Sequence, residues 1–238
     1  MDIAPYRSQV DAFERWLARS SSALKRWKQR LGNDPQGAVG EAMVWHFLTG
    51  HVDQIDLNED PKSGGPDFLC NTNGVDFLVE CTALTIKKAT NMTGLSNDLR
   101  DAGGAYSDPL ESVADKLNDK MDQLDGHDIP TLLVLCTFHL EYSAVAMRTF
   151  FVEQSLMSLY YNKEGDGSLV PARRNASAVL LLGFAVKPIV ALGMIHPAPV
   201  HGFSALLLPE VQFCSLPNWP ASVDGTTWSV SESDDKSN

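Results

Sequence analysis

Two short stretches early in the chain carry apolar residues at every second position and are joined by a turn signal. The positions that would share one face of a strand pair are Phe68, Cys70, Phe77, Val79 and Cys81. Asn73-Gly74 lies between the stretches, and Asn-Gly tolerates positive φ at both central positions of a two-residue hairpin. Leu69 and Leu78 add apolar groups to the opposite face. The pattern predicts a hairpin covered on both faces, as in a sheet sandwiched by helices.

Other apolar runs predict further strands. Pro130–Phe138 is an almost continuous apolar run, typical of a buried central strand. Ser177–Ala185 and Ile189–His196 predict two more strands, joined as a hairpin across residues 186–188. Leu206–Pro209 is expected to add a short edge strand.

Helical patterns separate these strands, so the predicted fold class is α/β. Asp34-Pro35 is typical of an N-cap followed by proline at the first helical position, and Gly50 is expected to end that helix. Leu110–Leu124 repeats apolar residues at helical spacing, and Tyr142–Tyr161 also indicates a helix. Two polar segments are expected to be loops: Ala89–Pro109 and Lys163–Asn175.

The hairpin brings two carboxylates together. If Thr72 pairs with Val75, counting outward along the strands pairs Asp67 with Glu80. Side chains at such opposite positions lie about 4.5–5.5 Å apart on one face, and like charges there are destabilising. A divalent cation such as magnesium, which prefers oxygen ligands and binds through one or two carboxylates, would offset the repulsion. The alternative is a solvated strand end at which water screens both acids.

These residues resemble the PD-(D/E)XK nuclease superfamily, which has the restriction-endonuclease-like fold. The resemblance rests on Pro66-Asp67 on one strand, Glu80-Cys81-Thr82 on the next, a preceding helix with Glu41, and a following helix and strand. It covers roughly Asp34–Phe138, under half of the chain. It implies a mixed sheet flanked by helices, to which this chain adds an N-terminal helix and extra C-terminal strands.

The resemblance also implies a function, magnesium-dependent phosphodiester hydrolysis of nucleic acid. Asp67, Glu80 and the backbone carbonyl of Cys81 would bind Mg²⁺, which Mn²⁺ can replace, and Glu41 would bind a second ion or a metal-bound water. Gly37 and Gly40 would let the helix approach the sheet and bring Glu41 near Asp67. The expected substrate is DNA rather than RNA, and the expected activity is that of an endonuclease.

One position departs from the family pattern, because Thr82 stands where the motif has lysine. In the family that lysine orients or deprotonates the attacking water and stabilises charge on the phosphate. Lys120, accompanied by Gln123 in the predicted helix, is the first candidate to replace it, followed by Lys88 and Lys62. The alternative is a nuclease-like module that no longer cleaves and binds nucleic acid or a protein partner.

The charge of the chain bears on the functional hypotheses but does not select one of them. The net charge of -11 counts against simple electrostatic binding of nucleic acid and leaves an acidic DNA mimic as a third hypothesis. The segment Arg7–Leu31 is the exception, with seven basic and two acidic residues along an apolar stripe, which predicts a basic amphipathic helix. Lys62, Lys88 and Arg100 are further candidates for contacts with nucleic acid.

The expected organisation is an N-terminal helix over residues 1–33, a nuclease-like domain over 34–220 and a disordered acidic tail over 221–238. The segment Met1–Arg7 lacks the pattern of a secretory signal, and prolines and glycines interrupt the apolar stretch Ala178–Ile195. We therefore expect a cytoplasmic protein that does not enter membranes, with a homodimer as one possible assembly. The four cysteines show no metal-ligand spacing and are expected to be reduced core residues.

Overall fold

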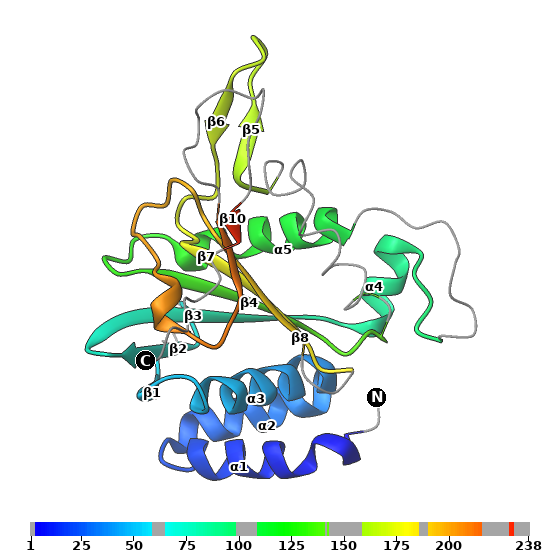
Figure 1. The fold of residues 1–238 in the computed structure, drawn as a ribbon. Helices are drawn as coiled ribbons and strands as arrows, with labels where there is room; N and C mark the ends of the chain where they lie inside the picture. Colours follow the sequence, from blue (N-terminus) through cyan, green and yellow to red (C-terminus); the bar gives the residue numbers. More distant parts are fainter. Residues whose placement is uncertain are drawn as a thin grey trace, which may run out of the picture.

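The computed structural model describes residues 3–58, 65–98, 109–140, 142, 159–185, 190–215 and 229–230. These residues form an α/β fold around a mixed eight-stranded sheet in the order β1-β2-β3-β4-β7-β8-β9-β10 (Figure 1). The strands are β1 Gln54–Leu57, β2 Phe68–Thr72, β3 Val75–Leu84, β4 Thr131–Thr137, β7 Ala178–Gly183, β8 Val190–Ile195, β9 Phe213–Ser215 and β10 Ser229–Val230. A separate small hairpin contains β5 Tyr161–Lys163 and β6 Leu169–Pro171.

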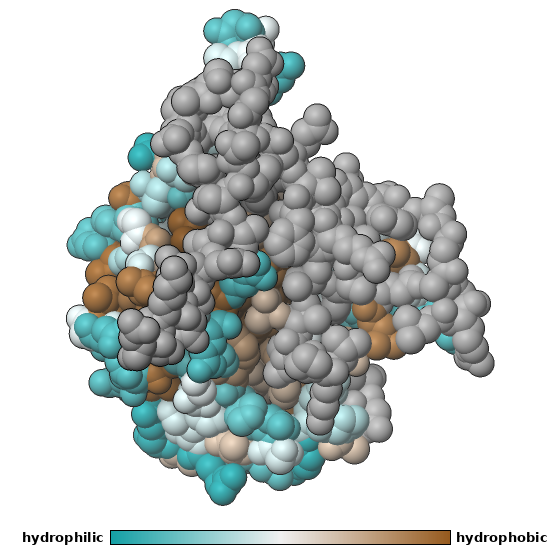
Figure 2. Space-filling view, viewed as in Figure 1, coloured by the Kyte–Doolittle hydropathy of each residue, from teal (hydrophilic) through white to brown (hydrophobic). Residues whose placement is uncertain are grey.

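Helices cover both faces of the sheet (Figure 1). One face packs against α1 Arg7–Leu17, α2 Ser21–Asn33 and α3 Pro35–Thr49, whose outer surfaces are largely hydrophilic in Figure 2. The other face packs against α4 Ile86–Thr93 and α5 Pro109–Leu124. The described ranges also contain two short 3-10 helices, η1 Ala4–Tyr6 and η3 Ala205–Leu207.

The predicted hairpin register is confirmed. Thr72 pairs with Val75, and the ladder continues without a bulge to the pair Phe68 and Val79. Asn73 and Gly74 have φ values of 54° and 79°, as a two-residue turn with both central residues left-handed requires. The ladder with β2 stops at Val79, whereas β3 continues to Leu84. The part of β3 that follows Val79 can therefore contact other elements on that side.

The predicted strands in the second half of the chain are also confirmed. β4 is buried along its whole length between β3 and β7, and it is parallel to both. β7 and β8 pair as an antiparallel hairpin. The four cysteines are all buried free thiols, as expected.

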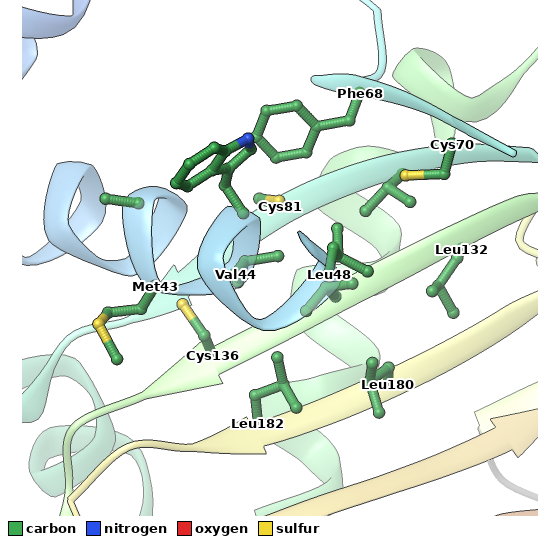
Figure 3. Close-up of a cluster of buried hydrophobic side chains, with 14 of the residues drawn as sticks. Met43, Val44, Leu48, Phe68, Cys70, Cys81, Leu132, Cys136, Leu180 and Leu182 are labelled. Atoms are coloured by element: carbon green, nitrogen blue, oxygen red, sulfur yellow. The ribbon is translucent and has the colours of Figure 1, made fainter. Parts of the chain in front are cut away.

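Helix α3 begins and ends where the sequence predicts. The Asp34 carboxylate accepts a hydrogen bond from the backbone N–H of Gly37 at 3.0 Å, and Gly50 is the residue that caps the C-terminus. The helix is buried on nearly every side because the sheet lies beneath it and α1 and α2 cover it. Figure 3 shows Met43, Val44 and Leu48 of this helix pointing at sheet residues that include Cys136 and Leu180.

The two glycines of α3 have different roles. A Cβ on Gly40 would lie 2.7 Å from the Sγ atom of Cys136 and 3.3 Å from the Cβ of Ala83, so the expected close approach to the sheet is confirmed there. For Gly37 the expectation is wrong, since its Cβ would instead collide with the carboxylate of Asp34. Gly37 therefore makes room for the helix cap.

The N-terminal segment forms two helices instead of the single helix predicted over Arg7–Leu31. The break falls at residues 18–20, where the Ser20 hydroxyl accepts from the backbone N–H of Ala23 and starts α2. Both helices bury residues in the same core as α3 and the sheet. Phe13 of α1 and Trp27 of α2 have their ring centroids 5.5 Å apart.

Several other expectations need correction. Leu206–Pro209 forms no edge strand: Ala205–Leu207 is a 3-10 helix that Ser204 caps, and β9 and β10 lie at that edge. The predicted loop Lys163–Asn175 contains part of the β5–β6 hairpin, where Gly165 and Asp166 are the central residues of a turn that the Gly167 N–H to Glu164 carbonyl hydrogen bond closes. The predicted loop Ala89–Pro109 begins inside α4. The predicted helix Tyr142–Tyr161 lies mostly outside the described residues, and its last residue, Tyr161, is the first residue of β5. Within the predicted disordered tail, the structure describes only Ser229–Val230, which form a strand.

The close approach of α3 gives a stability test. Gly40→Ala should lower the free energy of unfolding by about 1–2 kcal/mol, because the overpacking cost exceeds the gain in helix propensity. Gly32→Ala is the matched control: no atom lies within 4 Å of its Cβ, so it should stabilise by up to about 1 kcal/mol. Urea midpoints measure both, and Cys136→Ala should partly rescue Gly40→Ala. Equal effects of the two glycine substitutions would contradict the close approach.

Candidate functional site

The two hairpin acids lie side by side at the point where β2 begins. Asp67 directly precedes the last pair of the β2–β3 ladder, which places it in register with Glu80. Its Oδ2 atom accepts a hydrogen bond of 2.7 Å from the backbone N–H of Cys81, and its own carbonyl accepts one of 3.0 Å from Asn58. Both carboxylates are removed from solvent, with exposed fractions of 9% for Asp67 and 2% for Glu80. The alternative of a solvated strand end is therefore wrong.

The charged form of Glu80 is disfavoured in this position. Burial raises its pKa to about 8, the negative charge of Asp67 adds to the effect, and Lys120 and Arg30 oppose it. One carboxylate oxygen, Oε1, lies 2.7 Å from the Nζ atom of Lys120. The other, Oε2, is buried and has no hydrogen-bond partner within the described ranges of the chain. An unsatisfied buried carboxylate oxygen is costly, and it is the kind of atom that a cation would satisfy.

Lys120 reaches the site from α5. This helix packs its apolar side against the sheet through Val113, Leu117 and Leu124, which turns Lys120 toward β3. The ammonium group also donates to the Oε1 atom of Gln123 at 2.8 Å. Thus the lysine and glutamine singled out in the sequence lie together beside Glu80.

Glu41 reaches the same region from α3 on the opposite face of the sheet. Its side chain is 10% exposed, and its Oε2 atom lies 2.8 Å from the Nη1 atom of Arg30 on α2. Burial lowers the pKa of Arg30, but the charges of Glu41, Asp67 and other anionic groups outweigh burial and raise it. A pocket of about 50 Å³ opens beside this ion pair, lined by Leu17, Ala23, Arg26, Trp27, Arg30, Glu41 and Leu57.

The charges of all three acids act on the thiol of Cys81. Burial raises the pKa of the Cys81 thiol, and the charges of Asp67, Glu41 and Glu80 raise it further. Across the residues the structure describes, however, no three Asp, Glu, His or Cys side chains are gathered closely enough to form a complete metal-binding cluster. The two outer acids are each paired with a cation instead, Glu41 with Arg30 and Glu80 with Lys120.

The carboxylate oxygens at this site fit one hard divalent ion better than two. Asp67 and Glu80 supply two adjacent carboxylates, and magnesium typically takes one or two carboxylates and keeps several waters. The Oε2 atom of Glu80, which has no hydrogen-bond partner among the described residues, is the observation in favour of an ion there. The carboxylate of Glu41 is already paired with Arg30, so its role as a metal ligand stays a prediction.

The remaining predicted residues fall into three groups. Thr82 is buried on β3 two residues beyond Glu80, so no lysine comes from the motif position. Lys88 lies exposed on α4, near Lys116 of α5. Lys62 and Arg100 lie outside the described residues.

Arg30 and Lys116 are the charged residues that sequence reasoning missed. Arg30 was predicted only as one of several charges on a basic helix, and nothing local distinguishes it from its neighbours. Lys116 lies one helical turn before Lys120, and this i, i+4 spacing is a signal that could have identified it.

Comparisons with known proteins identify no relative of this chain. No family model, no curated protein and no solved structure matches it. None of the helices in the described ranges combines the length and the apolar character that crossing a membrane requires.

The raised pKa of Glu80 predicts how stability depends on pH without divalent ions. The folded protein keeps the Glu80 proton up to about pH 8, whereas the unfolded chain releases it near the usual pKa of 4.5. Raising the pH between these values should therefore lower the free energy of unfolding, by at most about 1.4 kcal/mol per pH unit from this group. Urea titrations in chelator at several pH values measure this slope. Glu80→Gln should flatten it, and an unchanged slope in that variant would contradict the assignment.

Proposed function

We propose that this protein is a magnesium-dependent phosphodiesterase acting on nucleic acid, with DNA as the substrate and internal cleavage as the activity. The observation that carries the proposal is the buried pair of Asp67 and Glu80, with an unpartnered Glu80 oxygen and the ammonium group of Lys120 next to it. A carboxylate pair that can hold a metal ion and an adjacent cation are groups that metal-dependent hydrolysis of a phosphodiester can use.

The order of the elements supports the same proposal. A helix with an acid, α3, precedes three antiparallel strands, β1 to β3, and α5 then leads into β4, which is parallel to β3. This order agrees with the resemblance to the PD-(D/E)XK nucleases. The three acids lie on α3, directly before β2 and within β3, which are the positions that the resemblance implies for them.

Each side chain has a distinct task in the proposed reaction. A divalent ion at Asp67 and Glu80 would lower the pKa of a bound water and neutralise charge that develops on the phosphate. The Cys81 N–H holds the Asp67 carboxylate in a fixed orientation. Lys120 replaces the motif lysine: its ammonium group orients the water or binds a phosphate oxygen. Arg30 holds Glu41 and adds a second positive charge near the acids.

The second candidate is a module that binds without cleaving. Two observations favour it: Thr82 stands in the lysine position, and the ammonium group of Lys120 already lies 2.7 Å from the Oε1 atom of Glu80. Such a module need not bind divalent ions at the acids. Ion binding therefore separates the two candidates.

Asp67→Asn tests the ion site directly. Addition of Mg²⁺ or Mn²⁺ should raise the melting temperature of the wild-type protein, because an ion present at 100 times its dissociation constant stabilises by about 2.7 kcal/mol. The variant should lose this effect and all divalent-dependent cleavage of DNA, while circular dichroism shows a native fold. Undiminished cleavage by Asp67→Asn would reject the proposal. Absence of any ion effect on wild type would favour the binding module.

Lys120→Met tests the replacement of the motif lysine. We expect kcat to fall by about 10²–10⁴-fold, the usual range for a group that moves a proton or stabilises charge. Affinity for Mg²⁺ should not fall, because the lysine no longer competes for Glu80. Lys28→Met is the control, since Lys28 is exposed on α2 and its Nζ atom lies 3.8 Å from the Oε2 atom of Glu14. Wild-type kcat in Lys120→Met would exclude the role.

A further inference from the structure

The β5–β6 hairpin projects from the body of the molecule (Figure 1). At its base lies His196, the residue that directly follows β8, with an exposed fraction of 1%. The centroid of its ring is 4.4 Å from that of Tyr160, which directly precedes β5. Its Nε2 atom lies 2.8 Å from the carbonyl oxygen of Ala172, which directly follows β6. One imidazole therefore contacts the residues that flank both strands of the hairpin.

The other ring nitrogen of His196 holds a third segment. The backbone N–H of Ala198 donates a hydrogen bond of 2.9 Å to the Nδ1 atom. The carbonyl of Ala198 accepts one of 2.8 Å from the Nε atom of Arg174, and the Val200 N–H donates one of 2.9 Å to the Arg174 carbonyl. The segment 197–200 after β8 is therefore linked to the segment 172–174 after β6, both through His196 and directly. We call the two hydrogen bonds of the imidazole the His196 clasp.

The partners of the ring determine its protonation state. A carbonyl oxygen can only accept and a backbone N–H can only donate, so Nε2 carries a proton and Nδ1 does not. The closed clasp therefore requires the neutral imidazole in this one tautomer. An imidazolium would point a second N–H at the N–H of Ala198, and that hydrogen bond would be lost.

The surroundings of His196 add to the cost of a charged ring. Burial lowers the pKa of His196, the hydrogen bond to the Ala172 carbonyl raises it, and the positive charge of Arg174 lowers it, with a downward shift as the result. In the described part of the chain Arg174 is the charged group that acts on the ring, and it repels an imidazolium. Tyr160 presents a neutral side chain, because burial raises the pKa of its hydroxyl, which donates to the carbonyl of Met194 at 2.8 Å.

We propose that the His196 clasp is a proton-sensitive latch: the neutral ring holds the base of the β5–β6 hairpin and the segment 197–200 to the end of β8, and the protonated ring releases both. The open state takes up a proton near the usual histidine pKa of 6.5, whereas the closed state resists it. Lowering the pH through and below this value therefore favours opening, and above it the clasp stays closed. The proposal does not depend on the acid pair or on the proposed function.

Amide hydrogen exchange tests the clasp in the wild-type chain. After correction for intrinsic rates, the protection factor of the Ala198 N–H should fall about 10-fold between about pH 7.5 and 5.5, because only the open state gains a proton in this interval. The Gly74 N–H, which donates to the Asn71 side chain at 3.1 Å in the β2–β3 turn, is the internal reference and should keep its protection. An Ala198 amide that is unprotected at the higher pH, or equally protected at both, overturns the proposal.

His196→Gln removes the titrating group and the Nδ1 acceptor. The Ala198 amide should then be weakly protected, with no dependence on pH across the same interval. His201→Gln is the matched control, since it removes a half-buried histidine five residues further along the chain and should keep the full pH dependence. A pH dependence that survives in His196→Gln, or that is lost in His201→Gln, contradicts the latch.

A second measurement needs no variant and so does not depend on whether His196→Gln folds. Nitrogen NMR of the imidazole rings should show His196 as the Nε2–H tautomer at neutral pH. The ring should remain neutral in the folded protein at about pH 6, where an ordinary histidine is mostly protonated. An Nδ1–H tautomer, or titration of His196 at the ordinary histidine pKa, would refute the proposal.

Discussion

The burial of Glu80 next to Asp67 is the constraint on which the arrangement of this protein depends. Two carboxylates inside an apolar sheet repel each other and lose hydration, which together disfavour the charged state. The fold supplies cations from both faces: Lys120 contacts Glu80 from α5, and Arg30 pairs with Glu41 from α2 while its charge also reaches Asp67. The two helical layers therefore do more than cover the sheet, since each contributes one of the charges that stabilise the acids.

Backbone geometry decides where these charges can meet. β2 begins at Phe68, opposite Val79, whereas β3 continues to Leu84, so β2 does not pair with the part of β3 that follows Val79. Gly40 lets α3 approach β3 and β4 closely, and the next residue on the helix is Glu41. A larger residue at position 40 would displace the helix and with it the ion pair of Glu41 and Arg30. Packing of the core and geometry of the site are thus set by the same contact.

Local signals were sufficient for the parts of the structure that neighbouring residues determine. Asn73-Gly74 determined the hairpin register, and with it the proximity of Asp67 and Glu80, and Asp34-Pro35 determined the start of α3. What the sequence could not provide depends on tertiary packing. The pairing of Arg30 with Glu41 and that of Lys120 with Glu80 each join two elements, and no spacing along one helix encodes their relative placement. The break at Ser20 was missed for a different reason, because the apolar stripe continues across it.

The position of the cations also bears on how an acidic protein could hold a polyanion. The net charge of -11 describes the whole chain, but a phosphate responds to the local potential, and charges farther away than about 10 Å are largely screened at ordinary salt. Lys116 and Lys120 of α5 lie beside Asp119 and Glu80, and Asp67 is next to Glu80, so the positive charges there do not outnumber the negative ones. Once an ion neutralises Asp67 and Glu80, the same region becomes clearly positive. Metal binding and phosphate binding would then reinforce each other, since each ligand removes charge that opposes the other.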